Sequence, residues 1–446
     1  MTRTDVRATV AALMPDLRRD LEELVRIPSV SGEGRPAEPL QQAHDEVARL
    51  FSEAGVQTDT LHLPDTAPIV IGEIPAPPGA PTVLLYSHYD VVPAGDEALW
   101  DSPPFEPTER DGALFGRGTA DTKANILAHV GALRAWGGRP PVGIKLLIEG
   151  NEEIGGAALT AYPAENPGLF ACDAMIIGDA GSVRPGVPTL TVALRGMAEV
   201  FVEVTTLASA KHSGMYGGAA PDALLTLLHA LSNLHDERGD VAVEGLRQTP
   251  WEGAGPDEEE FRALAEIRDG LPLMGTGDLA SRVWSGPAIT VIGIDAPSVA
   301  ESINAVIPSA RAKLNVRVHP AQDPVEAQAA VIDHLARLRP FGVDLRATPG
   351  ETGSGFAART DSAAYDAARA AWSQAWGAET VMIGVGGSIP VVNTLAQAVP
   401  AADILLVGAA DGYANIHGPN ERVLLDEFEK AVLAEADWFG RFAALA

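Results

Sequence analysis

The chain has 446 residues and a formal net charge of −28, from 60 acidic and 32 basic side chains. This acidic excess argues against nucleic acid and anionic membranes as partners, because both are polyanions. Hydrophobic residues make up 46% of the chain, which is typical of a folded protein, and the length favours two domains or one domain with a large insertion.

Cysteine usage and apolar runs indicate the compartment. The one cysteine, Cys172, excludes an internal disulfide and is compatible with a reducing cytosol. The N-terminal stretch lacks the continuous apolar segment of a signal peptide, and no run of about 18 apolar residues is present to span a membrane. We therefore expect a cytoplasmic protein with no membrane partner.

The first predicted elements alternate between helices and strands. Helical periodicity covers residues 5–26 and 36–55, and Gly55 ends the second helix. Strands are then expected at 68–75, 82–88, 143–150 and 174–181, with a helix at 123–137. This alternation predicts an α/β fold whose sheet has substantial parallel character. Ligands of such sheets bind at the carboxyl ends of the strands.

A second α/β unit is expected over residues 189–350. Its predicted order is β-α-β-β-α-β, which is typical of a small two-layer domain. The elements are expected at 199–206, 221–236, 288–294, 310–320, 323–338 and 343–350. After Gly350 the first pattern resumes. The prediction is therefore a discontinuous first domain, residues 1–188 and 351–446, with a second domain, residues 189–350, inserted into it.

Polar side chains lie at or just beyond the ends of the strands of the first domain. Imidazoles and carboxylates that meet on one rim of a sheet cannot all stay charged without a cation. They are ligands for zinc, with manganese or cobalt possible, and there are enough of them for two ions about 3.5–4 Å apart. Any one of them alone is more simply a cap, turn or loop residue. The residues are His88, Asp90, Asp121, Glu152, Glu153, Asp179 and His417.

Six motifs give this pattern a family resemblance. In chain order they are SHYDVVPAG, GRGTADTKAN, GNEEIGG, GDAG, GGSIP and HGPNE. Together they resemble the dinuclear zinc metallopeptidases that include carnosinases, cytosolic non-specific dipeptidases, aminoacylases and glutamate carboxypeptidases. The resemblance implies a zinc-exopeptidase-like α/β domain, a mixed sheet sandwiched by helices, interrupted by a lid or dimerisation domain.

The resemblance also implies a role for each polar residue of the first domain. Asp90 would orient a metal-binding histidine, and Glu152 would act as the general base. Two divalent ions, most simply zinc, would be bound. His88 and Asp179 would hold one ion, Glu153 and His417 the other, and Asp121 would bridge them.

In the inserted domain the resemblance points to two further residues. His212, in SAKHSGMYGG, matches a lid histidine that stabilises the oxyanion and in dimeric relatives comes from the partner subunit, although Lys211 departs from the motif. Arg317 matches an arginine that binds a substrate carboxylate. Each could instead be an ordinary surface residue. The resemblance thus favours a homodimer formed through the lid.

The loop GGSIP resembles a substrate loop of the dipeptidase branch, where Gly386, Gly387 and Ser388 would hold a terminal carboxylate. This loop, together with HGPNE, favours a dipeptidase acting on dipeptides or short peptides. An N-acyl amino acid amidohydrolase or a carboxypeptidase of the same family remains open. A non-catalytic binding protein is the remote alternative, because it predicts the loss of a ligand or of the base, and all are present.

Overall fold

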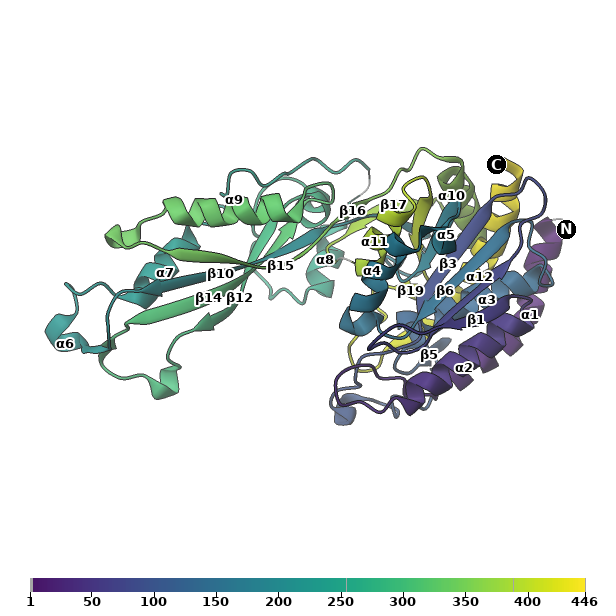
Figure 1. Cartoon of the computed structure of the whole chain (residues 1–446), viewed down its shortest axis with the longest axis horizontal. Helices are drawn as coiled ribbons and strands as arrows, with labels where there is room; N and C mark the ends of the chain where they lie inside the picture. Colours follow the sequence, from purple (N-terminus) through teal and green to yellow (C-terminus); the bar gives the residue numbers. More distant parts are fainter. Residues whose placement is uncertain (1–2, 254, 388, 446) are drawn as a thin grey trace. The chain divides into compact units, whose positions relative to one another are not determined.

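The computed structural model describes residues 3–253, 255–387 and 389–445, which divide into two compact units (Figure 1). The first unit holds the residues up to 192, residues 358–382 and those from 390 onwards; the second holds residues 193–357 and 383–389. The sequence placed the boundaries at 188/189 and 350/351. The return of 383–389 to the second unit was not foreseen, because VMIGVGGSIP has the pattern of one continuous strand and loop.

The first unit is built around a mixed β-sheet with the strand order β1-β2-β6-β3-β7-β18-β9. Its four adjacent middle strands, β6, β3, β7 and β18, run parallel, whereas the outer neighbours are antiparallel. Parallel strands are covered on both faces and therefore read as continuous apolar runs. The strands are β1 (Gln57–Leu61), β2 (Ile69–Ile74), β3 (Thr82–His88), β6 (Gly143–Glu149), β7 (Ala174–Gly178), β9 (Thr189–Leu194) and β18 (Asp403–Val407).

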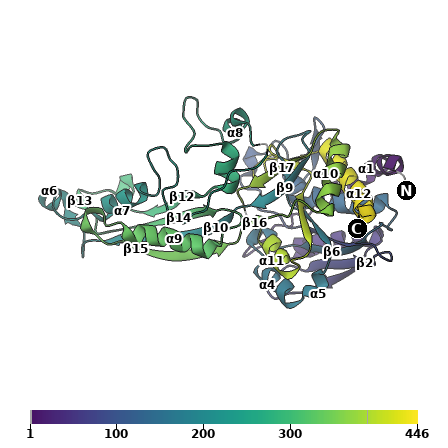
Figure 2. The ribbon, with the colours of Figure 1, turned by 90° about the horizontal axis from the view of Figure 1, so that it is seen from above.

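Helices cover both faces of this sheet (Figures 1 and 2). One layer packs around α3, which is buried along nearly its whole length, as expected of a helix enclosed by others. This layer contains α1 (Arg3–Val25), α2 (Glu38–Glu53), α3 (Ala124–Ala135), α10 (Ala363–Trp376) and α12 (Leu425–Leu445). The other contains α4 (Ala157–Glu165), α5 (Pro167–Phe170) and α11 (Pro390–Ala398). The predicted sheet between helices is confirmed.

The second unit is a four-stranded antiparallel sheet, in the order β12-β14-β10-β15, with α7 and α9 packed against it. Along β10 every second residue is buried, so one face of the sheet meets the two helices. The predicted β-α-β-β-α-β order is confirmed. The elements are β10 (Gly196–Thr205), α7 (Ala223–Ser232), β12 (Ala288–Asp295), β14 (Ser309–Val318), α9 (Pro324–Arg337) and β15 (Arg346–Gly353).

Short elements complete the two units. A short helix, α8 (Glu258–Leu264), is capped by the Asp257 carboxylate, which accepts a hydrogen bond from Glu260 N at 2.9 Å. No described helix combines the length and apolar character needed to cross a membrane. The other short elements are β4 (Thr108–Arg110), β5 (Ala113–Phe115), β8 (Gly181–Ser182), β11 (Lys211–His212), α6 (Ser213–Tyr216), β13 (Ala305–Val306), β16 (Phe356–Ala357), β17 (Val381–Val385), β19 (Ala410–Asp411) and β20 (Arg422–Leu424).

Candidate metal centre

The carboxyl ends of three neighbouring parallel strands bring the first candidate residues together. His88 is the last residue of β3, and Asp179 directly follows β7, the neighbour of β3 on one side. Glu152 and Glu153 lie in a single 3₁₀ turn just beyond β6, the neighbour on the other side. The rim predicted from the sequence is therefore formed by consecutive strands of one sheet.

Asp121 lies between two histidines. One of its carboxylate oxygens is 3.1 Å from His88 Nε2 and the other is 3.1 Å from His417 Nε2. His88 Nε2 is also 3.5 Å from Asp179 Oδ1, and His417 Nε2 is 3.0 Å from Glu153 Oε2. Two ligands of one tetrahedral zinc, each about 2.0–2.1 Å from the ion, lie roughly 3.3 Å apart. The observed separations therefore fit two ions that share Asp121.

The tautomer of His88 also suits a metal ligand. Its Nδ1 lies 3.0 Å from the backbone carbonyl of Asp90, which can only accept a hydrogen bond, so Nδ1 carries the proton. In the neutral imidazole, which is the form that binds a metal, Nε2 is then the nitrogen with the free lone pair, and it faces Asp121 and Asp179. Because His88 is fully buried, this orientation is fixed by the fold.

Asp90 connects the histidine to the carboxylates of the next strand. Its two carboxylate oxygens accept hydrogen bonds from the backbone N–H groups of Glu152 and Glu153, both at 3.2 Å. Its Oδ1 is also 3.4 Å from His88 Nδ1. Asp90 therefore holds the turn that presents two candidate carboxylates, in addition to orienting His88.

The pKa values of three residues in this cluster are raised above their usual range. Burial, together with the charge of Asp179, raises the pKa of Glu152 to about 8, and burial raises that of Asp179 to about 6. Hydrogen bonds to Asp121 and Glu153 raise the pKa of His417 to about 10. Burial alone raises the pKa of a carboxyl group, but neighbouring carboxylates contribute to all three shifts and mark an excess of negative charge. Two divalent cations would remove that excess, so the donor set fits the predicted ions.

Glu421 is a functional candidate that the sequence analysis passed over, although it belongs to the quoted motif HGPNE. It is fully buried, and its carboxylate accepts four hydrogen bonds from the loop that carries Asp121. The donors are Arg117 Nη1 (2.6 Å) and the backbone N–H groups of Gly118 (3.0 Å), Ala120 (2.9 Å) and Asp121 (3.1 Å). No local pattern could indicate this contact, because its partners are about 300 residues apart in the chain.

Two residues of α3 form hydrogen bonds with the ends of β7 and β3. Asn125 donates to the carbonyl of Gly178, directly before Asp179, at 3.0 Å, and accepts from Ala409 N at 2.8 Å. One turn further along, His129 Nε2 lies 3.1 Å from the carbonyl of Tyr86. The helix that begins beyond Asp121 thus ties the ends of β7 and β3 in place.

The remaining candidates belong to the second unit. His212 is exposed, and its Nδ1 accepts a hydrogen bond from Gly214 N at 3.1 Å, so Nε2 carries the proton. Arg317 is half-buried on β14. Gly386 and Gly387 follow β17, and Ser388 lies outside the described residues.

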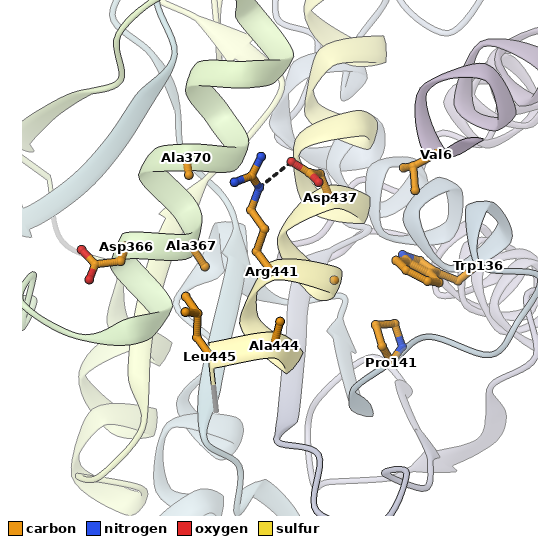
Figure 3. A pocket seen from close by; sticks show the side chains of 11 residues that line it. Val6, Trp136, Pro141, Asp366, Ala367, Ala370, Asp437, Arg441, Ala444 and Leu445 are labelled. Carbon is orange, nitrogen blue, oxygen red and sulfur yellow. Dashed lines mark hydrogen bonds and ion pairs between the residues drawn. The ribbon is translucent and has the colours of Figure 1, made fainter. Parts of the chain in front are cut away.

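A hollow of about 540 Å³ in the first unit is separate from these residues (Figure 3). It is lined by parts of α1, α10 and α12 and by Trp136 and Pro141. Its one arginine, Arg441, pairs with Asp437 at 2.6 Å. None of the candidate metal ligands lines it, so we do not assign the reaction to this hollow.

The sequence matches the model of "Peptidase family M20/M25/M40" over residues 84–439. The chain belongs to this peptidase family. Among curated relatives, the M20 chain is 39% identical to the cysteinylglycine-S-conjugate dipeptidase of Corynebacterium striatum, over 94% of both chains. It is 28% identical to the beta-Ala-His dipeptidase of Rattus norvegicus, over 92% of this chain and 90% of the relative.

A solved structure gives the same fold. An M20 family metallo-carboxypeptidase from Sulfolobus solfataricus is 25% identical, with a TM-score of 0.81, covering 96% of this M20 chain and 99% of its own. The resemblance predicted from the six motifs is therefore confirmed, and the chain is a metallopeptidase of this family. Its His, Asp and Glu cluster is a candidate dinuclear metal site.

Proposed function

We propose that this chain is a dinuclear metal-dependent dipeptidase that hydrolyses the peptide bond of dipeptides or short peptides. One observation carries the proposal: each oxygen of Asp121 faces a histidine that also has a second carboxylate beside it. The two dipeptidase relatives support the choice of substrate. The proposed ligands are His88 and Asp179 for one ion, Glu153 and His417 for the other, and Asp121 for both.

Bound at these residues, two divalent ions would supply Lewis-acid polarisation of the scissile carbonyl and would acidify the attacking water. Glu152 would accept the proton of that water and pass it to the leaving amine. Adjacent residues of one turn point in different directions, so Glu153 can serve as a ligand while Glu152 remains free for proton transfer. Asp90 would keep both in place through its two backbone contacts.

The proposal also gives roles to residues of the second unit. The Nε2 proton of His212 is available to stabilise the oxyanion of the tetrahedral intermediate. The guanidinium of Arg317 and the N–H groups of Gly386 and Gly387, with the Ser388 hydroxyl, would hold the carboxylate of the substrate. These roles follow the family pattern of the motifs.

A substrate panel tests the dipeptidase proposal against its nearest alternatives. Free dipeptides, the same dipeptides with acetylated N-termini, and N-acyl amino acids should be compared after loading the protein with zinc, manganese or cobalt. We expect amine release from free dipeptides, because a dipeptidase recognises both termini. Preferential cleavage of the acylated compounds would instead establish a deacylase or a carboxypeptidase.

A homodimer formed through the second unit is also part of the proposal. β12 is an edge strand with three exposed apolar side chains: Val291 is 40%, Ile292 52% and Ile294 43% exposed. Free strand edges with apolar side chains favour pairing with a second chain. Sedimentation velocity should show a dimer for the wild type and a monomer for Ile292→Lys. The exposed control Val325→Lys, on α9, should stay dimeric, and a monomeric wild type would exclude this contact.

A further inference from the structure

Arg195 has a position in the second unit that its sequence context, VALRGM, does not explain. Its backbone N–H donates to the carbonyl of Val385 at 3.1 Å, which places it beside the segment that carries Gly386 and Gly387. A Cβ atom at Gly386 would lie 2.8 Å from Arg195 Nη2, closer than real contacts allow. The guanidinium of Arg195 therefore lies directly beside the backbone of Gly386.

Arg195 is only partly satisfied by its surroundings. Nη1 donates two long hydrogen bonds, to the carbonyls of Arg282 (3.4 Å) and Gly286 (3.3 Å). Nε is buried and has no hydrogen-bond partner among the described residues, and the same holds for Arg282 Nε and Trp251 Nε1 nearby. Trp251 adjoins this segment, because a Cβ at Gly384 would come within 3.2 Å of its ring. The region therefore has more N–H donors than acceptors.

A second guanidinium lies beside the first. Arg317 pairs across the sheet with Met197, two residues beyond Arg195, and lies near enough for its charge to act on Arg195. Burial and the charge of Arg317 together lower the pKa of Arg195 to about 10. Neither arginine forms an ion pair with any described residue. This is notable in a chain with 60 acidic and only 32 basic side chains.

One ligand would supply both the missing negative charge and the missing acceptors. A carboxylate carries a charge and only accepts hydrogen bonds, and arginine binds it through paired N–H donors. We infer that Arg195 is a second substrate-binding arginine, which acts with Arg317 to hold the substrate carboxylate against the Gly384–Gly387 segment. The identification of the ligand as a substrate carboxylate rests on the proposed dipeptidase function. The observation that the two arginines form no ion pair with any described residue is independent of that function.

The test compares one dipeptide with and without its terminal charge. Cysteinylglycine and its C-terminal amide should be assayed with wild type, Arg195→Gln and Arg195→Lys. We expect Arg195→Gln to lower kcat/KM for the free acid by about 10–100-fold, mainly through KM, and to leave the slow cleavage of the amide unchanged. Arg195→Lys, which keeps the charge but loses the planar fork, should recover part of that loss. The exposed Arg337→Gln, on α9, is the matched control for removing one positive charge.

A purely structural role for Arg195 gives a different result. Equal losses for acid and amide, or no loss for either, would overturn the inference. If the wild type cleaves no dipeptide, binding of glycine and glycinamide to the metal-free protein is measured instead, by isothermal titration calorimetry. Glycine should then bind more tightly than glycinamide in wild type and Arg337→Gln, and the preference should vanish in Arg195→Gln. If Arg195→Gln still binds glycine more tightly than glycinamide, the inference about Arg195 is wrong. That result is separate from the failure of the proposed function, which the absence of dipeptide cleavage would show.

Discussion

Replacing Glu152 by glutamine is expected to lower kcat by about 10²–10⁴-fold while two metal ions remain bound. Glutamine keeps the size of the side chain but cannot accept the proton of the attacking water. Without a cation, burial and neighbouring carboxylates raise the pKa of Glu152 to about 8. Elemental analysis of the purified variant gives the metal content, and turnover of a dipeptide gives the rate.

The same measurements on Asp121→Ala provide the contrast. Because Asp121 faces both histidines, its loss should remove metal and activity together. Glu152 also lies close enough to His88 and Asp179 to form a possible ligand group with them. A Glu152→Gln protein that has lost one ion would therefore assign Glu152 to a metal and leave the base unidentified.

Replacing Glu421 by glutamine is expected to weaken metal binding by about 10–100-fold and to lower the free energy of unfolding by about 3–5 kcal/mol. The amide group would present N–H donors to a loop that itself only donates, and Arg117 would be left buried without a negative partner. The N–H of Asp121 would lose its acceptor or share it. Titration of the metal-free protein with zinc and unfolding in urea measure the two effects.

Asp20→Asn separates the two effects of the Glu421 variant. Asp20 is buried and pairs with Arg134 at 2.6 Å, in the helix layer of the first unit, away from the candidate ligands. This control should lower the free energy of unfolding without changing the affinity for zinc. If Asp20→Asn weakens zinc binding as much as Glu421→Gln does, the role proposed for Glu421 in positioning Asp121 is wrong.

The sequence predicted those site residues whose position follows from the residues next to them in the chain. His88 and Asp179 end apolar runs that can only be buried strands, so their place on one rim follows from the parallel sheet. Glu421 and Arg195 were missed for a physical reason. The first acts through backbone N–H groups, which carry no residue-specific signal, and the second lies beside Gly386, which is far away in the sequence. Such contacts exist only after the chain has folded.

The strand order also determines at which stage of protein synthesis the candidate metal centre can be completed. β18 lies between β7 and β9, so the sheet stays divided until residue 407 has left the ribosome, long after its neighbours. His417 and Glu421 follow later still. The nascent chain can therefore hold four of the five candidate ligands but neither the fifth nor the carboxylate that supports Asp121. Strands joined over such sequence distances fold slowly, and hydrolytic competence is gained only in the last tenth of the chain.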